Sequence, residues 1–103
     1  MNLSIVDDKT AEELRKVGYP YSQLQEGLVL KPTQAEVCKW LRSNYELYIL
    51  IDFFINTKEE VKWWFTIAQP TIGYVQPDEN QFNSYEKAEL EGIKKGIEIL
   101  RDK

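Results

Sequence analysis

The chain has 103 residues, of which 43% are apolar and 29% charged, and its formal net charge at pH 7 is −4. This length suffices for one domain with a packed core. The sequence contains no histidine and one cysteine, Cys38. Histidine is the usual general base near neutral pH and the commonest transition-metal ligand, so its absence excludes histidine-dependent catalysis, while a single thiolate cannot build a zinc site. The acidic balance disfavours a surface that tracks nucleic-acid phosphates.

The first thirty residues are predicted to form an arm, residues 1–30, that packs on the rest of the chain. The spacing predicts a short helix over residues 10–17, capped by Thr10 and ended by Gly18. An irregular connector follows, with a short strand at residues 28–30. No apolar run is long enough to span a membrane, and the N-terminus lacks the basic start and apolar middle of an export signal. These features favour a cytoplasmic protein without membrane contact.

Residues 31–103 are predicted to form an α-β-β-β-α unit. A helix over residues 31–44 opens with a capping box, in which Thr33 and Glu36 bond each other's backbone. Two aromatic-rich strands follow over residues 45–55 and 61–68, and the short polar link between them is typical of an antiparallel hairpin.

The C-terminal half of this unit is predicted to contain a third strand and a long helix. The third strand centres on Ile72, Tyr74 and Val75, with Gly73 as a bulge within it. The last helix, over residues 84–101, is capped by Ser84 and carries acids early and basic residues late. Small residues recur every fourth position in this helix and predict a close packing groove against the sheet: Ala88, Gly92 and Gly96.

Alternation along the strands predicts which side chains face the helices. The expected core face carries Trp63 and the odd positions of the first strand: Leu47, Ile49, Ile51, Phe53 and Ile55. The opposite face carries the candidate interface residues Tyr48, Leu50, Phe54 and Trp64. Three interpretations remain open for this outer face. The arm can cover it as a second small core, it can form a homodimer or partner interface, or its rings can stack single-stranded nucleic acid.

No residue pattern points to catalysis, a metal or a cofactor. Cys38 lies inside a predicted helix with no base in the local sequence to activate it, so we interpret it as structural. Adjacent acids such as Asp7 and Asp8 lack calcium-loop spacing and are expected to be solvated. We therefore predict no catalytic residue, no metal ligand and no cofactor.

The order α-β-β-β-α resembles that of double-stranded-RNA-binding domains. The start of the last helix reads Ser84-Tyr85-Glu86-Lys87-Ala88-Glu89, which is acidic where those domains carry a lysine cluster, so the resemblance implies the fold with weak or no nucleic-acid binding. Residues 47–98 also resemble antitoxin-type domains of bacterial toxin–antitoxin pairs. That resemblance implies a sheet that binds a toxin.

Three short motifs resemble small uncharacterised proteins of phages and mobile elements of Bacteroides-type gut bacteria. They are Gly18-Tyr19-Pro20, then Pro32-Thr33 with Trp40-Leu41-Arg42, and finally Ser84-Tyr85-Glu86-Lys87-Ala88. The resemblance implies a genomic setting and no known activity.

We therefore expect a single α+β domain of order α-α-β-β-β-α, with an antiparallel three-stranded sheet and two main helices packed on one face. The arm is expected over an edge or the outer face of this sheet. The expected function is non-catalytic: protein–protein contact through the aromatic sheet face, with an unidentified partner or a second copy as in a homodimer.

Overall fold

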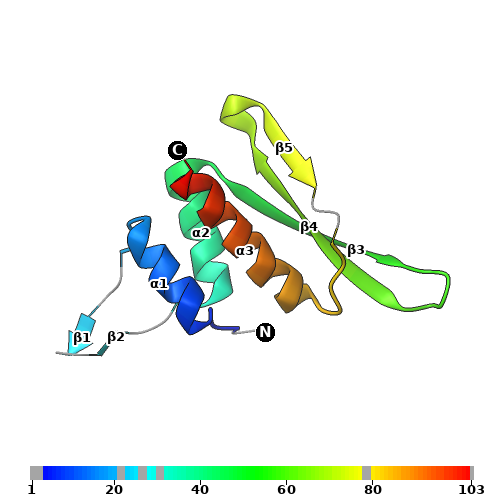
Figure 1. Cartoon of the computed structure of the whole chain (residues 1–103), viewed down its shortest axis with the longest axis horizontal. Coiled ribbons are helices and arrows are strands. Elements are labelled where there is room, and N and C mark those ends of the chain that lie inside the picture. Colours follow the sequence, from blue (N-terminus) through cyan, green and yellow to red (C-terminus); the bar gives the residue numbers. More distant parts are fainter. Residues whose placement is uncertain (1–3, 21–22, 26–27, 30–31, 78–79, 103) are drawn as a thin grey trace.

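The computed structural model describes residues 4–20, 23–25, 28–29, 32–77 and 80–102. It confirms the α+β class, the order α-α-β-β-β-α of the main elements and the three-stranded antiparallel sheet. A separate two-stranded hairpin, β1 with β2, lies between the first two helices. Figure 1 shows the elements in chain order: α1 (Asp8–Lys16), β1 (Gln23–Gln25), β2 (Leu28–Val29), α2 (Gln34–Tyr45), β3 (Tyr48–Ile55), β4 (Val61–Gln69), the 3₁₀ turn η1 (Pro70–Ile72), β5 (Tyr74–Pro77) and α3 (Tyr85–Arg101).

Helix α1 begins two residues before its predicted start. Its N-cap is Asp7, whose carboxylate accepts the Thr10 N–H at 2.7 Å, so Thr10 lies in the first turn and is not the cap. Asp and Thr are both common cap residues, and here the earlier one takes the position. The predicted end is nearly correct, because the helix ends at Lys16 and Gly18 adopts φ +92° just beyond it.

Helix α2 opens with the predicted capping box, since Thr33 and Glu36 bond each other's backbone N–H groups. Its C-terminal end differs from the prediction. The helix continues through Tyr45, and Glu46 ends it in a left-handed conformation at φ 51°, with its N–H donated to the Arg42 carbonyl. The predicted strand start at residue 45 is therefore wrong, because Tyr45 is still helical and the left-handed cap at Glu46 delays the strand until Tyr48.

The main sheet has the strand order β3-β4-β5, with both neighbours antiparallel. Tyr48 pairs with Ala68 and Ile55 with Val61, so β3 is paired with β4 along its full length. The predicted third strand is wrong at its start. Ile72 belongs to the turn η1, and Gly73, at φ +68°, redirects the chain so that β5 starts at Tyr74.

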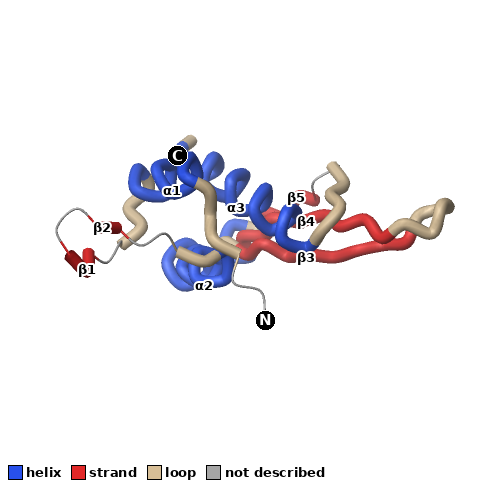
Figure 2. Tube along the Cα trace, turned by 90° about the horizontal axis from the view of Figure 1, so that it is seen from below, coloured by secondary structure: helices blue, strands red, loops and turns tan. Residues whose placement is uncertain are grey.

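Helix α3 lies across β3 and β4, while α2 packs against α3 and the start of β3 (Figures 1 and 2). One core fills the space between these elements. Its buried members come from α1, α2, β4 and α3 and from the segments just before α1 and β3: Val6, Leu14, Val37, Cys38, Leu41, Leu47, Phe65, Ile67, Ile93 and Ile97.

The described part of the arm lies with the helices and not over the outer sheet face. Helix α1 contacts α3, and Leu14 is fully buried in the common core. Tyr19 packs its ring on Trp40 of α2 at 5.1 Å. The β1–β2 hairpin lies at the opposite end of the molecule from the β3–β4 turn (Figures 1 and 2). The expectation that the arm covers an edge or the outer face is thus wrong for these residues, because Leu14 finds its apolar partners between the helices.

The predicted packing groove on α3 is confirmed. A Cβ atom placed on Gly92 would lie 2.5 Å from Cγ2 of Ile49 and 3.3 Å from Cγ of Phe65. At Gly96 the nearest atom would be Cδ2 of Leu47, at 3.1 Å. These glycines let the helix backbone approach the sheet closely, which compensates for their low helix propensity.

Candidate protein-contact surface on the β3–β4 hairpin

The β3–β4 hairpin extends past the N-terminal end of α3, so the inner face of its outer half is uncovered (Figure 1). Leu47 is buried, and Ile49 and Ile51 pack partly against the core. Further along the same face, Phe53 is 52% exposed and Ile55 is 63% exposed. The prediction that these two side chains belong to the core is wrong, because the strands run on beyond the start of the helix that would cover them.

The four predicted interface residues share the outer face of the sheet. Phe54 and Trp64 are in contact, with ring centroids 5.4 Å apart, and both are half-buried. Leu50 is 52% exposed opposite Thr66. Tyr48 lies opposite Ala68 and, at the usual rise of a strand, is roughly 20 Å along β3 from Phe54. The structure thus brings Phe54 and Trp64 into contact and keeps Tyr48 apart from them. Leu50 lies between Tyr48 and Phe54 along β3.

A second apolar surface lies on the inner face, and sequence reasoning missed it. Trp63 contacts Phe53 at 5.2 Å and Tyr85 of α3 at 5.7 Å between ring centroids. Val61 is 45% exposed and pairs with Ile55. Trp63 was predicted to be a core residue, but it is only partly buried, because Tyr85 is the first residue of α3 and no helical turn precedes it.

We call the two surfaces together the hairpin patch. Its residues are Leu50, Phe54 and Trp64 on the outer face and Phe53, Ile55, Val61 and Trp63 on the inner face. The sequence signal for the patch was apolar character on both faces of the hairpin, as in Phe53-Phe54-Ile55. A strand that is covered on one face only usually alternates apolar and polar residues.

The strands of the hairpin carry two charged side chains, Lys62 and Asp52, and both make hydrogen bonds within the protein. Lys62 donates to Oδ1 of Asn83 at 2.7 Å. Asp52, the one charged residue of β3, accepts the N–H of its neighbour Phe53 at 2.7 Å through Oδ1. The turn is held by Asn56, whose Oδ1 accepts the backbone N–H groups of Lys58 and Glu60. The inner face of the patch is therefore apolar, whereas the outer face also carries Asp52, opposite Trp64, and Lys62, opposite Phe54.

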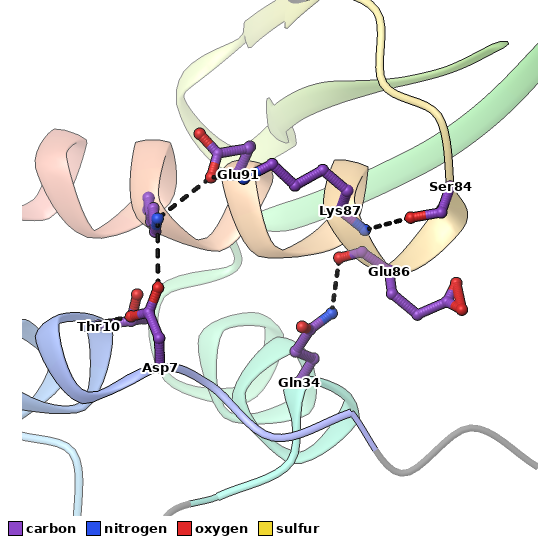
Figure 3. Close-up of polar contacts among 8 residues, drawn as sticks. Asp7, Thr10, Gln34, Ser84, Glu86, Lys87 and Glu91 are labelled. Atoms are coloured by element: carbon purple, nitrogen blue, oxygen red, sulfur yellow. Dashed lines mark hydrogen bonds and ion pairs between the residues drawn. The ribbon is translucent and has the colours of Figure 1, made fainter.

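A groove of about 260 Å³ lies between α1 and α3, and its charges neutralise one another. Arg101 pairs with Glu13, and Lys94 pairs with Asp7 at 3.4 Å and with Glu91 at 3.2 Å. Figure 3 shows Asp7, the N-cap of α1, and Glu91 of α3 bridged in this way. The bond from Thr10 and the nearby Lys94 hold the pKa of Asp7 below its usual value. We interpret this groove as a helix–helix contact.

A partly buried polar cluster joins the N-terminal halves of α2 and α3. The Gln34 side chain donates to the Glu86 carbonyl at 3.0 Å, shown in Figure 3, and to Glu89 Oε1 at 2.9 Å. Cys38 lies 3.8 Å from the same carboxylate, and Tyr85 donates to it. Burial and the charge of Glu89 raise the pKa of Cys38 to about 12, so the thiol stays protonated at neutral pH.

Within residues 4–77 and 80–102, apart from the short gaps in the arm, no three acidic or thiol side chains gather as metal ligands would. No helix in the described part of the chain has the length and apolar character needed to cross a membrane. Comparison with models of known protein families, with curated proteins and with solved structures gave no match.

Proposed function

We propose that this protein acts by non-catalytic protein–protein contact and that the hairpin patch is its contact surface. One observation carries the proposal: the β3–β4 hairpin presents large apolar side chains on both faces beyond the helices, with Leu50, Phe53 and Ile55 each more than half exposed. Monomeric proteins rarely expose contiguous apolar surface of this kind, and such surface typically marks a contact site.

The residue types in the patch support the same proposal. Aromatic side chains are enriched at the centres of protein interfaces, where they bury much area and lose little conformational entropy. Trp63 and Trp64 lie on opposite faces of one strand, and each is already held in place by a neighbouring ring. Prearranged rings reduce the ordering cost of binding.

The basic residues give less support to nucleic-acid binding. Lys94 is paired with two carboxylates and Lys95 lies 3.5 Å from Glu98, so both are neutralised locally. Affinity for phosphates depends on unpaired lysines and arginines gathered on one surface. The resemblance to phage and mobile-element proteins stays a prediction about genomic setting.

The proposal is tested by placing a charge in the patch. We expect Leu50→Glu and Trp64→Glu to weaken self-association, or capture of a partner from an extract of the native cell, by at least about tenfold, because central interface residues typically contribute more than 1 kcal/mol. Self-association is measured by light scattering across concentrations. Ile72→Glu is the matched control, since Ile72 is 61% exposed but lies on η1, outside the patch.

Thermal unfolding of each variant separates a contact role from a folding role. At a concentration where both proteins are monomeric, we expect Leu50→Glu to unfold at the wild-type temperature, because the side chain is half exposed in the free protein. The proposal is wrong if no association or capture depends on Leu50 or Trp64. If Trp64→Glu alone unfolds the protein, Trp64 is a packing residue. The effect of Leu50→Glu on association or capture then decides whether the proposal holds.

A further inference from the structure

The two edges of the main sheet are built differently. On one side, β5 covers β4 from Thr66 to Gln69, and the Phe82 backbone pairs with Trp63 further along. This edge is short, and β5 ends in Pro77, as protected edges commonly do. On the other side β3 is eight residues long, and no strand among the described residues pairs with its outer edge.

Hydrogen bonding of β4 shows which β3 backbone groups point outward. Trp63 donates its N–H to the Phe82 carbonyl and accepts the Phe82 N–H in return, both at 2.8 Å. The backbone groups of Trp63 therefore point away from β3. Trp63 and its register partner Phe53 thus form a non-hydrogen-bonded pair of the ladder. By the alternation of an antiparallel ladder, the outward N–H and C=O groups belong to Ile49, Ile51, Phe53 and Ile55.

This open edge lacks the usual devices that prevent strand addition. Native edge strands carry lysines, prolines or bulges, or are very short. β3 contains no lysine, proline or glycine and pairs with β4 without a bulge. Its one obstacle is Asp52, which adds a negative charge and covers the outward N–H of Phe53 with its own carboxylate.

We propose that a second copy of this chain adds its own β3 antiparallel to this edge, so that the two sheets join into one continuous six-stranded sheet. The inference rests on the proposed function and names the partner and the mode of contact. In the joined sheet the remaining outer edges are the two short β5 strands.

Charge and symmetry favour a second copy as the occupant. A twofold axis at Asp52 would set two carboxylates directly opposite each other, which is destabilising. With the axis at Ile51, Asp52 of one copy lies opposite Leu50 of the other. With the axis at Phe53, Asp52 lies opposite Phe54, so neither register places the two carboxylates directly opposite each other. With the axis at Ile51, Ile49 lies opposite Phe53; with the axis at Phe53, Ile51 lies opposite Ile55. In both registers inner-face side chains meet inner-face side chains of the second copy, and an isologous interface requires this self-complementarity.

The first test replaces an outward N–H without touching the β3–β4 ladder. Ile51→Pro removes an outward donor that neither the ladder nor Asp52 uses, whereas Phe54→Pro removes one that the ladder does use. We expect wild type to dimerise by light scattering, Ile51→Pro to be folded with association weakened by at least about tenfold, and Phe54→Pro to lose the hairpin. We expect Asp52→Ala to tighten association at least about threefold, while Glu98→Ala, an equal charge change on α3, leaves it unchanged.

Amide hydrogen exchange of the wild type is the second readout and does not depend on a variant folding. The inward amides of Leu50 and Phe54 are expected to be protected at every concentration. The outward amides of Ile51 and Ile55 should become protected only as the dimer forms. Fast exchange at Ile51 and Ile55 in a dimer, or a dimer that Ile51→Pro leaves intact, overturns the inference.

The failure of this inference and the failure of the proposed function give different results. A protein that stays monomeric at all concentrations excludes the second copy. The proposed function survives that result if capture of another protein still depends on Leu50 and not on Ile72. The proposed function fails only when substitutions in the hairpin patch change neither association nor capture.

Discussion

Cys38 illustrates how a single buried contact decides the chemistry of a side chain. It lies in the core beside the Glu89 carboxylate, and this environment disfavours the thiolate. We expect the folded protein to react with an aromatic disulfide reagent at pH 8 at least about a hundredfold more slowly than a free cysteine, because the thiolate is the nucleophile. Release of coloured thiol measures the rate, and fast reaction in the native state would contradict the burial of Cys38.

Asp7 acts at the same scale, through the cap of α1. We expect Asp7→Ala to lower the free energy of unfolding by about 1 kcal/mol, and Asp7→Asn by less, because asparagine also accepts the Thr10 N–H. Urea unfolding of the three proteins at pH 7 measures the difference. Equal stability of Asp7→Ala and wild type would show that the cap contributes nothing.

The lowered pKa of Asp7 also predicts a pH dependence. The stability that its charge contributes is fully present above pH about 4, the usual pKa of an unfolded aspartate, and is lost as the pH falls through the lower folded-state value. Asp7→Asn should therefore lose less stability than wild type below pH 4. The effect should be modest, because the Asp7 side chain is 45% exposed and solvent screens it.

At the scale of the element, α3 depends on its small residues for its distance from the sheet. We expect Gly92→Ala to lower the free energy of unfolding by about 1–2 kcal/mol, since the added methyl overlaps the branched Ile49 side chain and overpacking outweighs the gain in helix propensity. Gly96→Ala is the control and should stay within about 1 kcal/mol of wild type, because the Leu47 side chain can shift. Urea unfolding measures both, and a Gly92→Ala variant as stable as wild type would contradict the close approach.

Much of each element could be predicted from local sequence because local chemistry determines it. The capping box at Thr33 and the cap at Ser84 need only residues three positions apart, and alternation alone placed Leu50 and Trp64 on one face. How far α3 extends over the inner face of the sheet could not be predicted. Whether Phe53 is buried depends on where α3 begins in space. Among the described residues, the turn at Gly73 and the pairing of Phe82 with Trp63 help to set that position.

The whole molecule is elongated, with extents of 52 × 31 × 21 Å and a radius of gyration of 14.6 Å. A compact chain of about 100 residues has a radius near 13 Å, so this domain is extended for its length. The two hairpins at opposite ends account for the difference (Figure 2). The position of α1 among the helices was not predictable from its weak apolar face, since only the assembled core provides the site for Leu14.

The order of the elements along the chain also sets the conditions of biosynthesis. β3 and β4 are translated before α3, yet α3 supplies Ile93 and Ile97, which cover the inner face of those strands. At translation rates of about 5–20 residues per second, the nascent hairpin waits on the order of seconds for its helix, with apolar side chains and an unpaired edge in water. The interval before α3 emerges is therefore when this chain is most exposed to misassembly, and when a chaperone that binds apolar strands would act on it.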